Sequence, residues 1–279
     1  MSDDDHKPSF DSHRTDTAEV APVLPVVDSE PLDALRLPWV LEFHLIDHDV
    51  QFQAQVREAL VIGRADRETP DAPDIDLSAY DAQGVSRRHA VLRARHGRLT
   101  VEDLASRNGT RLNDFDLLPN TEYRLKDGDM LTLGRLRIRV SVTVMPSRRS
   151  GEDTPLPAVG HGKRILLVTD NPHLSGALNA ALERANFRVY TLPNGKAALR
   201  DMNAVQPDLL LLDLSTPDLL TFDFMRLARR RQKRRLPILA LTGNDASPNR
   251  TLRADAYLGR PISLIEMVGT LAIAIGNAK

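Results

Sequence analysis

Three short motifs between residues 63 and 110 carry the side chains with the clearest chemistry. They are Gly63-Arg64, Ser86-Arg87-Arg88-His89 and Ser106-Arg107-Asn108-Gly109-Thr110. Guanidinium groups form planar, charge-assisted hydrogen bonds with phosphate oxygens, and a serine hydroxyl adds a neutral one. An asparagine amide can bind the peptide backbone beside the phosphorylated residue. Together, these residue types are suited to a dianionic phosphate carried by a peptide.

The motifs fall on loops between segments with the pattern of β-strands. The strand-like runs within residues 38–145 are 39–43, 59–62, 90–92, 99–101 and 136–142. They are β-branched or alternate between apolar and polar residues, as strands with one buried face do. Many short strands separated by Gly, Pro and Asn turns predict a β-sandwich.

Each motif alone is weak evidence, because Gly-Arg is a common dipeptide and Asn-Gly is the usual type I′ hairpin turn. Their order is more specific, and it resembles that of the forkhead-associated (FHA) domain. The segment 73–77 and Val85 between the first two motifs, and Gly128-Asp129 after the third, also follow that family's pattern. FHA domains recognise phosphothreonine peptides through an arginine-based pocket, so the resemblance implies this activity for residues 38–145.

The resemblance also implies a role for each residue of the motifs. Arg64, Ser86, Arg87 and Arg107 are expected to coordinate the phosphate, and Asn108 is expected to bind the peptide backbone. The residues expected to support the binding loops are Gly63, His89 and Gly109.

The pattern changes at Lys163, where apolar strands begin to alternate with helices. The predicted strands are 165–168, 188–192, 209–212, 238–241 and 256–258. A helix is predicted from His173 to Ala185, and a Ser263-Leu264-Ile265-Glu266 capping box predicts a last helix to about Ile275. This alternation predicts a doubly wound, flavodoxin-like α/β sheet with ligands at the carboxyl ends of its strands.

Polar residues stand at those strand ends. Asp170 follows the first strand, Asp213 ends the third, Thr242 ends the fourth and Arg260 follows the fifth. This arrangement resembles the CheY-like receiver domain of bacterial response regulators over residues 163–279. The resemblance implies that Asp213 is the phosphoacceptor, that Thr242 faces the phosphoryl oxygens and that Tyr257 is the aromatic that changes rotamer on activation.

Two positions depart from the receiver pattern. Thr169 stands where receivers carry the first of two acidic residues, and Arg260 stands where they carry a lysine. The Mg²⁺ ion of an intact receiver would here have Asp170, Asp213 and the Ser215 carbonyl, one carboxylate fewer than usual. A planar guanidinium is also no substitute for a compact ammonium group. We therefore expect that no cofactor is required and that any Mg²⁺ site is weak.

Composition sets the remaining expectations. A chain of 279 residues is long enough for two ordinary domains, and it contains no cysteine, so disulfides and thiolate metal sites are excluded. The acidic start of the chain is no signal peptide, and no apolar run is long enough to span a bilayer. These features predict a cytoplasmic protein.

The predicted organisation has four parts. Residues 1–37, with nine acidic and three basic side chains, are expected to be a disordered tail, and residues 146–162 a linker. Residues 38–145 and 163–279 are the two domains. Thr15 and Thr17 of the tail are further candidates for phosphorylation, with the tail then occupying the chain's own pocket.

Three functions from different classes remain open, and no motif of an independent enzyme is present. The first is a signalling adaptor that binds phosphothreonine proteins made by a Ser/Thr kinase, with the receiver as a docking or dimerisation module. The second is an active response regulator of a phosphorelay, phosphorylated at Asp213 by a histidine kinase and controlling the FHA domain. The third is a nucleic-acid-binding regulator that uses the basic run 229–235, although a solvated helix end explains that run as well.

Overall fold

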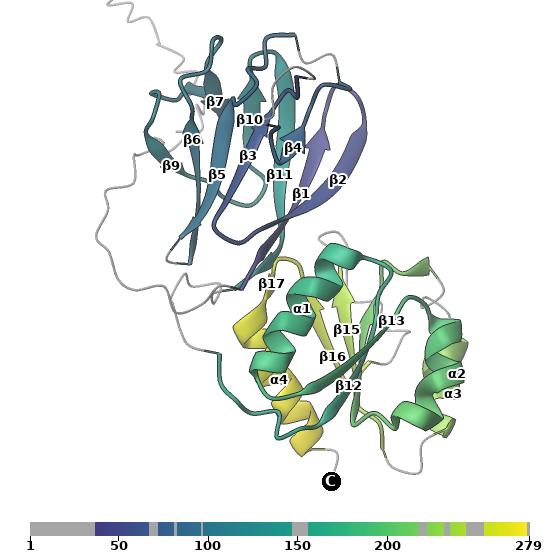
Figure 1. Ribbon diagram of the computed structural model, residues 1–279. Helices are drawn as coiled ribbons and strands as arrows, with labels where there is room; N and C mark the ends of the chain where they lie inside the picture. The colour runs from purple at the N-terminus through teal and green to yellow at the C-terminus, as the bar shows by residue number, and fades with distance from the viewer. Residues whose placement is uncertain are drawn as a thin grey trace, which may run out of the picture.

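The chain folds into a β-sandwich followed by an α/β domain (Figure 1). This computed structural model describes residues 37–66, 72–80, 83–95, 97–146, 156–217, 222–231, 235–243 and 254–277. Within these ranges, the first domain has strands alone and the second has all the helices. The fold class predicted for each domain is therefore confirmed.

Two sheets face each other in the sandwich. The first sheet contains, in order, β2 (Val50–Val56), β1 (Trp39–Leu45), β11 (Leu136–Met145), β10 (Met130–Leu133), β7 (Thr110–Leu112) and β8 (Phe115–Asp116). The second contains β4 (Ile75–Asp76), β3 (Ala59–Gly63), β5 (Ala90–Arg95), β6 (Arg98–Asp103) and β9 (Glu122–Arg124). Among these strands, neighbours are antiparallel except for β3 and β4, which are parallel.

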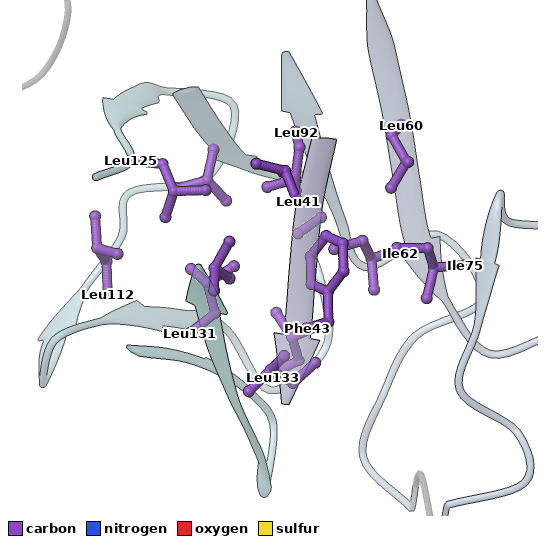
Figure 2. Close-up of a cluster of buried hydrophobic side chains, with 14 of the residues drawn as sticks. Leu41, Phe43, Leu60, Ile62, Ile75, Leu92, Leu112, Leu125, Leu131 and Leu133 are labelled. Atoms are coloured by element: carbon purple, nitrogen blue, oxygen red, sulfur yellow. The ribbon is translucent and has the colours of Figure 1, made fainter. Parts of the chain in front are cut away.

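Alternation of residue types decides which side chains enter the core of the sandwich. In β1, Leu41, Phe43 and Leu45 are fully buried among residues of the opposite sheet, such as Ile62 and Leu92 (Figure 2). Successive side chains of a strand point to opposite faces, so the intervening Glu42 and His44 lie on the outer face. This core fixes the register of the strands that carry the three motifs.

The second domain has a parallel five-stranded sheet with helices on both faces. The sheet order is β13 (Arg188–Leu192), β12 (Arg164–Val168), β14 (Leu209–Asp213), β15 (Ile238–Thr242) and β16 (Ala256–Gly259). The helices α1 (Pro172–Arg184) and α4 (Leu264–Gly276) cover one face, and α2 (Gly195–Val205) and α3 (Phe222–Arg231) cover the other. The central strands are buried on both faces, which explains their continuous apolar sequences.

Side-chain caps define where three of the described helices begin, with Asn194 capping α2. Asn171 caps α1, since its Oδ1 accepts hydrogen bonds from the amides of His173 and Leu174, both at 3.0 Å. The predicted capping serine is confirmed: Ser263 Oγ accepts from the amide of Glu266 at 3.2 Å and α4 starts at Leu264. The Asn171 cap starts α1 directly after Thr169 and Asp170, which follow the carboxyl end of β12.

The structure changes two details of the predicted organisation. Leu37, assigned to the disordered tail, is only 2% exposed and lies in the core of the second domain, while residues 1–36 lie outside the described residues. Leu156 and Val159, at the end of the predicted linker, pack against that same core. Residues 147–155 of the linker are outside the described ranges.

A short strand that sequence patterns did not predict joins the two domains. β17 (Ile262–Ser263) pairs in parallel with the end of β11, with Val144 opposite Ile262 and Met145 opposite Ser263. The two domains are therefore joined by a β-ladder as well as by the chain between them.

Candidate functional site

The three motifs converge on one cleft of about 630 Å³ at an end of the sandwich. Its lining residues are Arg64, Ser78, Gln83, Gly84, Val85, Ser86, Arg87, Arg107 and Asn108. All five residues predicted to bind a phosphopeptide are thus brought together, from loops that follow β3, precede β5 and follow β6. Ser78, Gln83 and Gly84 are additional lining residues that the motifs did not indicate.

The cleft lies at the end of the sandwich away from the second domain. β1 leaves that domain at Trp39 and runs to Leu45, and the antiparallel β2 returns to Val56. The two-residue turn after Val56 then sends β3, from Ala59 to Gly63, away from the second domain again. The loop after Gly63 is therefore at the end of the sandwich far from the second domain, which lies below the sandwich in Figure 1. Nothing in the described part of the second domain covers the cleft.

Ser86 is oriented by a neighbouring backbone group. Its Oγ accepts a hydrogen bond from the amide of Arg107 at 3.1 Å, and its carbonyl accepts from the amide of Arg64 at 3.1 Å. A hydroxyl is both donor and acceptor, so the Ser86 hydrogen stays available for an anion in the cleft. These contacts hold the loops of Arg64, Ser86 and Arg107 together.

The arginines of the cleft are exposed, whereas Asn108 is fixed. Asn108 Nδ2 donates to the carbonyl oxygen of Gly84 at 2.9 Å, and the amide oxygen of the same side chain can accept from a peptide amide. Arg64 and Arg107 are exposed, and Arg87 has one distant ion pair with Asp66 at 3.8 Å. A cluster of exposed guanidinium groups around one hydroxyl favours a phosphate ligand.

The buried side chain of His89 connects the second motif to the third by hydrogen bonds. Its Nδ1 accepts from the amide of Ser86 at 3.0 Å, so the ring proton is on Nε2, 3.1 Å from the carbonyl oxygen of Gly109. The ring is fully buried, and burial lowers the pKa of His89 below its usual value of 6.5, although the Gly109 carbonyl and Asp103 act in the opposite direction. His89 therefore acts as a neutral support and has no exposed atom to serve as a base.

Asp103 is a supporting residue that the motif analysis missed. Its buried carboxylate accepts hydrogen bonds from the Ser106 amide at 3.0 Å, the Ser106 hydroxyl at 2.6 Å and the Thr110 hydroxyl at 2.6 Å. These bonds set the turn that presents Arg107 and Asn108. An aspartate three residues before a serine is the sequence signal of such a turn.

Gly63 is needed because two loops pass very close to each other. A Cβ atom built on Gly63 would lie 1.9 Å from the carbonyl oxygen of Arg87, far inside van der Waals contact. The close passage allows the hydrogen bond between Arg64 and Ser86. The predicted supporting role of Gly63 thus has a steric basis.

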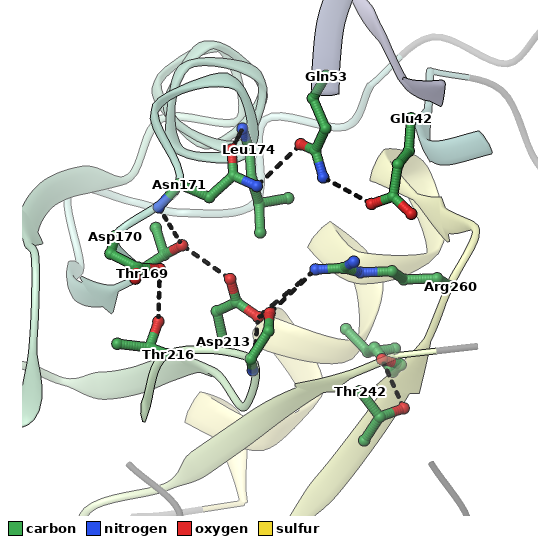
Figure 3. Close-up of polar contacts among 12 residues, drawn as sticks. Glu42, Gln53, Thr169, Asp170, Asn171, Leu174, Asp213, Thr216, Thr242 and Arg260 are labelled. Carbon is green, nitrogen blue, oxygen red and sulfur yellow. Dashed lines mark hydrogen bonds and ion pairs between the residues drawn. The ribbon is translucent and has the colours of Figure 1, made fainter. Parts of the chain in front are cut away.

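The second candidate site is the pocket at the carboxyl ends of the parallel strands (Figure 3). Asp213 ends β14 and is 1% exposed. Its Oδ2 accepts from the Thr169 hydroxyl at 2.8 Å, and its Oδ1 accepts from the amide of Ser215 at 3.1 Å and from the Ser215 hydroxyl. Arg260 Nη2 lies 3.7 Å from the same Oδ1. Both oxygens of the predicted phosphoacceptor are already engaged by donors.

The polar contacts of this pocket leave a magnesium ion few free ligands. Mg²⁺ requires oxygen ligands in near-octahedral geometry, whereas Thr169 and Ser215 direct hydrogens at Asp213 and Arg260 brings a positive charge. In the described part of the chain, no three acidic, histidine or cysteine side chains gather as a metal site. Receiver domains commonly bind Mg²⁺ at this position, and a weak site at Asp170, Asp213 and Ser215 stays a prediction.

The other predicted residues of the pocket occupy its edges. Asp170 is exposed, and its Oδ1 accepts from the Thr216 hydroxyl at 3.4 Å. Thr242 Oγ1 is 3.5 Å from the carbonyl oxygen of Leu258, and the Tyr257 hydroxyl accepts from the amide of Ala254 at 3.1 Å. The strand ends are where the sequence predicted them, and the predicted residues that contact Asp213 directly are Thr169, Ser215 and Arg260.

The basic run 229–235 is partly occupied by contacts within the domain. Arg229 and Arg235 pair with Asp255 at 2.9 Å and 3.1 Å, and the Arg231 guanidinium donates to the carbonyl oxygen of Leu199. Residues 232–234 lie outside the described ranges. These contacts favour the structural explanation of the run over nucleic-acid binding, which stays untested. In the same ranges, no helix has the length and apolar character required to cross a membrane.

Comparison with known proteins assigns a family to each domain. Residues 60–134 match the family model of the FHA domain, and residues 165–271 match that of the response regulator receiver domain. The transcriptional regulatory protein TrcR of Mycobacterium tuberculosis is 34% identical over 118 residues, which are 41% of this chain and 46% of TrcR. Protein FraH of Nostoc is 39% identical over 75 residues, 26% of this chain and 25% of FraH. The chain thus spans half or less of the length of these curated relatives.

Solved structures resemble each domain separately. One from a study of phosphothreonine-dependent FHA domain interactions is 30% identical, with a TM-score of 0.30, and covers 37% of this chain and 95% of its own. The receiver domain of the Francisella response regulator 1452 is 21% identical, with a TM-score of 0.38, and covers 42% of this chain and 99% of its own. The two family matches fall in the two domains of the chain: the FHA match lies within the β-sandwich and the response regulator receiver match lies within the α/β domain.

Proposed function

We propose that this protein is a signalling adaptor that binds phosphothreonine-containing proteins at the FHA cleft. The observation that carries the proposal is the convergence of Arg64, Ser86, Arg87, Arg107 and Asn108 on one open cleft. Three guanidinium-bearing loops supply the charge for a dianionic phosphate, and the Ser86 hydroxyl supplies a neutral donor. Asn108 binds the backbone next to the phosphorylated residue. Selection of threonine over serine is carried over from the FHA family.

In this proposal, the receiver is a docking or regulatory module with an atypical pocket. Asp213 is buried and bonded to Thr169, Ser215 and Arg260, so an incoming phosphoryl group would have to displace these donors. The missing carboxylate at Thr169 removes one of the negative charges that attract Mg²⁺. Both features support a receiver that is phosphorylated slowly or not at all.

The alternative function is an active response regulator, and the presence of Asp213 keeps it open. A phosphorylated Asp213 would control the FHA domain in that case. Under either function, the immediate partner at the cleft is a protein that a Ser/Thr kinase has phosphorylated. Neither function requires this chain to be an enzyme. A histidine kinase enters only with the alternative.

The experiment that tests the proposal is a binding assay with degenerate peptide libraries. Fluorescence anisotropy of the full chain is measured with three libraries that share flanking residues and carry phosphothreonine, phosphoserine or unmodified threonine at the centre. The proposal predicts binding to the phosphothreonine library and much weaker binding to the other two. Equal binding of the phosphorylated and unmodified libraries would contradict it.

A further inference from the structure

The outer face of the FHA sheet presents an uncommon set of side chains. In β2, the sequence Val-Gln-Phe-Gln-Ala-Gln-Val alternates strictly, so Gln51, Gln53 and Gln55 share the face opposite the FHA core. Pairing with β1 adds Val40 and Glu42 to this face. The exposed face of a strand usually carries charged side chains. The glutamine amides of β2 beside the fully buried Val40 instead indicate that another part of the chain covers this face.

The receiver covers the apolar half of this face. Val40 and Val144 of the FHA sheet are fully buried, and they share a hydrophobic core with Leu174 of α1 and with Ile262 and Leu264 of the receiver. Consecutive residues of β1 therefore enter two different cores: Val40 packs into the receiver and Leu41 packs into the FHA sandwich. Because both domains bury β1, separating them would expose apolar surface to water.

The polar half of the face is bonded to the start of α1. Gln55 Nε2 donates to the carbonyl oxygen of His173 at 2.8 Å, and Gln53 Oε1 accepts from Asn171 Nδ2 at 2.8 Å. Gln53 Nε2 in turn donates to Glu42 at 3.0 Å. α1 approaches so closely that a Cβ built on Gly176 would lie 2.9 Å from Gln55 Nε2.

Asn171 connects this contact with the receiver pocket (Figure 3). Its backbone amide donates to Thr169 Oγ1 at 3.2 Å, and Thr169 Oγ1 donates to Asp213 Oδ2 at 2.8 Å. A continuous chain of hydrogen bonds thus runs from Asp213 through Thr169, Asn171 and Gln53 to Glu42. Thr169, which replaces an acidic residue of ordinary receivers, is the member of the chain that contacts Asp213.

We propose that the FHA domain and the receiver are one cooperative unit, in which Asn171 is the positioning residue that couples the FHA sheet to the Asp213 pocket. The partner of the outer FHA face is then the chain's own receiver. This inference is independent of phosphopeptide binding, because the cleft lies at the opposite end of the sandwich. It predicts that changes on the FHA face alter the receiver pocket and that changes at Asn171 alter FHA stability.

Two spectroscopic probes report the two domains separately in the full chain. Trp39 is the single tryptophan of the sequence, and it is 8% exposed in the FHA core, so its fluorescence follows FHA unfolding. The described helices all lie in the receiver, so ellipticity at 222 nm follows that domain. In urea, one cooperative unit gives coincident transitions with a slope expected for both domains together.

The test variant is Asn171→Asp, and its matched control is Asn194→Asp. Both asparagines cap receiver helices, and aspartate is an equally good N-cap, so the caps survive in both variants. Only Asn171→Asp replaces an amide donor to Gln53 by an acceptor. We expect it to lower the Trp39 midpoint by about 0.5 M urea, the shift for one lost hydrogen bond in a unit of this size. Asn194→Asp should leave the Trp39 midpoint unchanged.

A charge pair provides the rescue. Gln53→Lys combined with Asn171→Asp places an ammonium group between two carboxylates, the one introduced at position 171 and that of Glu42, and should restore the Trp39 midpoint. A merely local role of Asn171 in capping α1 predicts no rescue by a change in the FHA domain. Separate transitions in the wild type, or an unchanged Trp39 midpoint in Asn171→Asp, would overturn the proposal.

The coupling to the pocket has its own measurement. The amide of Ser215 donates to Asp213, so its ¹H–¹⁵N resonance reports the pocket. Gln53→Leu removes the FHA end of the chain and should shift this resonance, while Gln51→Leu, on the same strand face but exposed, should not. A Ser215 resonance that moves equally in both variants, or in neither, would refute the role of Asn171.

Discussion

The imidazole of His89 joins the second and third motifs: its Nε2 lies 3.1 Å from the carbonyl oxygen of Gly109, while its Nδ1 accepts from the amide of Ser86. Protonation of the ring would add a hydrogen at Nδ1 and break the bond to Ser86. The geometry of the cleft therefore depends on a buried histidine that stays neutral.

This dependence predicts a loss of stability in mildly acidic solution. Burial lowers the pKa of His89 in the folded chain below 6.5, so the unfolded chain takes up a proton first as the pH falls. Above the usual pKa, protonation of His89 therefore has no effect on the free energy of unfolding. As the pH falls below 6.5, it lowers that free energy. Urea unfolding followed by Trp39 between pH 8 and pH 5.5 should show this decline.

Substitution of the histidine provides the control for that measurement. His89→Gln has no ring to protonate and should flatten the decline, even though its stability at pH 8 is lower. His48→Gln, at an exposed position of the same domain, should retain the full decline. The account of His89 is wrong if the wild type and His89→Gln show the same pH dependence.

Gly63→Ala should damage the cleft through a steric clash. The new methyl group would overlap the carbonyl oxygen of Arg87, a backbone atom, and would force the loops of Arg64 and Ser86 apart. We expect phosphopeptide affinity to fall by at least tenfold. Gly269→Ala in α4 meets no atom within 4 Å and should bind normally, with a helix that is about 0.5–1 kcal/mol more stable. Normal affinity of Gly63→Ala would contradict the close passage of the loops.

Asp103→Asn should loosen the loop that carries Arg107 and Asn108. If the new NH2 group takes the place of Oδ1, the Ser106 and Thr110 hydroxyls lose their acceptor, and if it takes the place of Oδ2, it faces the Ser106 amide, which is also a donor. A buried donor without a partner costs about 1–3 kcal/mol, and the free energy of unfolding should fall by that amount. The exposed Asp116→Asn serves as the control. An Asp103→Asn variant as stable as this control would exclude a supporting role for Asp103.

The receiver should be a poor phosphoacceptor. With acetyl phosphate and Mg²⁺, we expect slow and incomplete modification of Asp213 by intact-mass measurement, because Thr169 supplies no carboxylate and Arg260 crowds the pocket. Thr169→Asp combined with Arg260→Lys should increase the modification. Rapid stoichiometric phosphorylation of the unmodified chain, lost in Asp213→Asn, would instead establish the active response regulator.

Local patterns were sufficient to predict the fold class of each domain, whereas the five motif residues of the cleft were predicted from their resemblance to the FHA family. The alternation in β1 and β11 predicted the sandwich, and the continuous apolar runs of β12 and β14 predicted the parallel sheet. The motif residues of the cleft follow strand ends, so their convergence follows from the pairing of those strands. The type of each strand and the position of its ends depend on residues close together in the sequence, which is why they could be predicted.

Features that depend on contacts far apart in the sequence could not be predicted. β17 has two residues and exists because the end of β11 offers it a partner, and Leu37 is buried because the receiver packs against it. The third bond to Asp103, from Thr110, likewise requires the folded loop. The alternating glutamines of β2 were visible, but only the position of α1 shows what they bind.

The central claim is that the cleft binds phosphothreonine through Arg64, and calorimetric titration with one phosphothreonine peptide from the library assay tests it most directly. Arg64→Ala should lose about 1.5–3 kcal/mol of binding free energy, the range for a hydrogen bond to a charged group. Arg98→Ala, an exposed arginine at the opposite end of the same domain, should bind like the wild type. The same peptide without its phosphate should give no measurable heat. If the wild type binds both forms of the peptide with equal affinity, or if Arg64→Ala binds like Arg98→Ala, the claim is wrong.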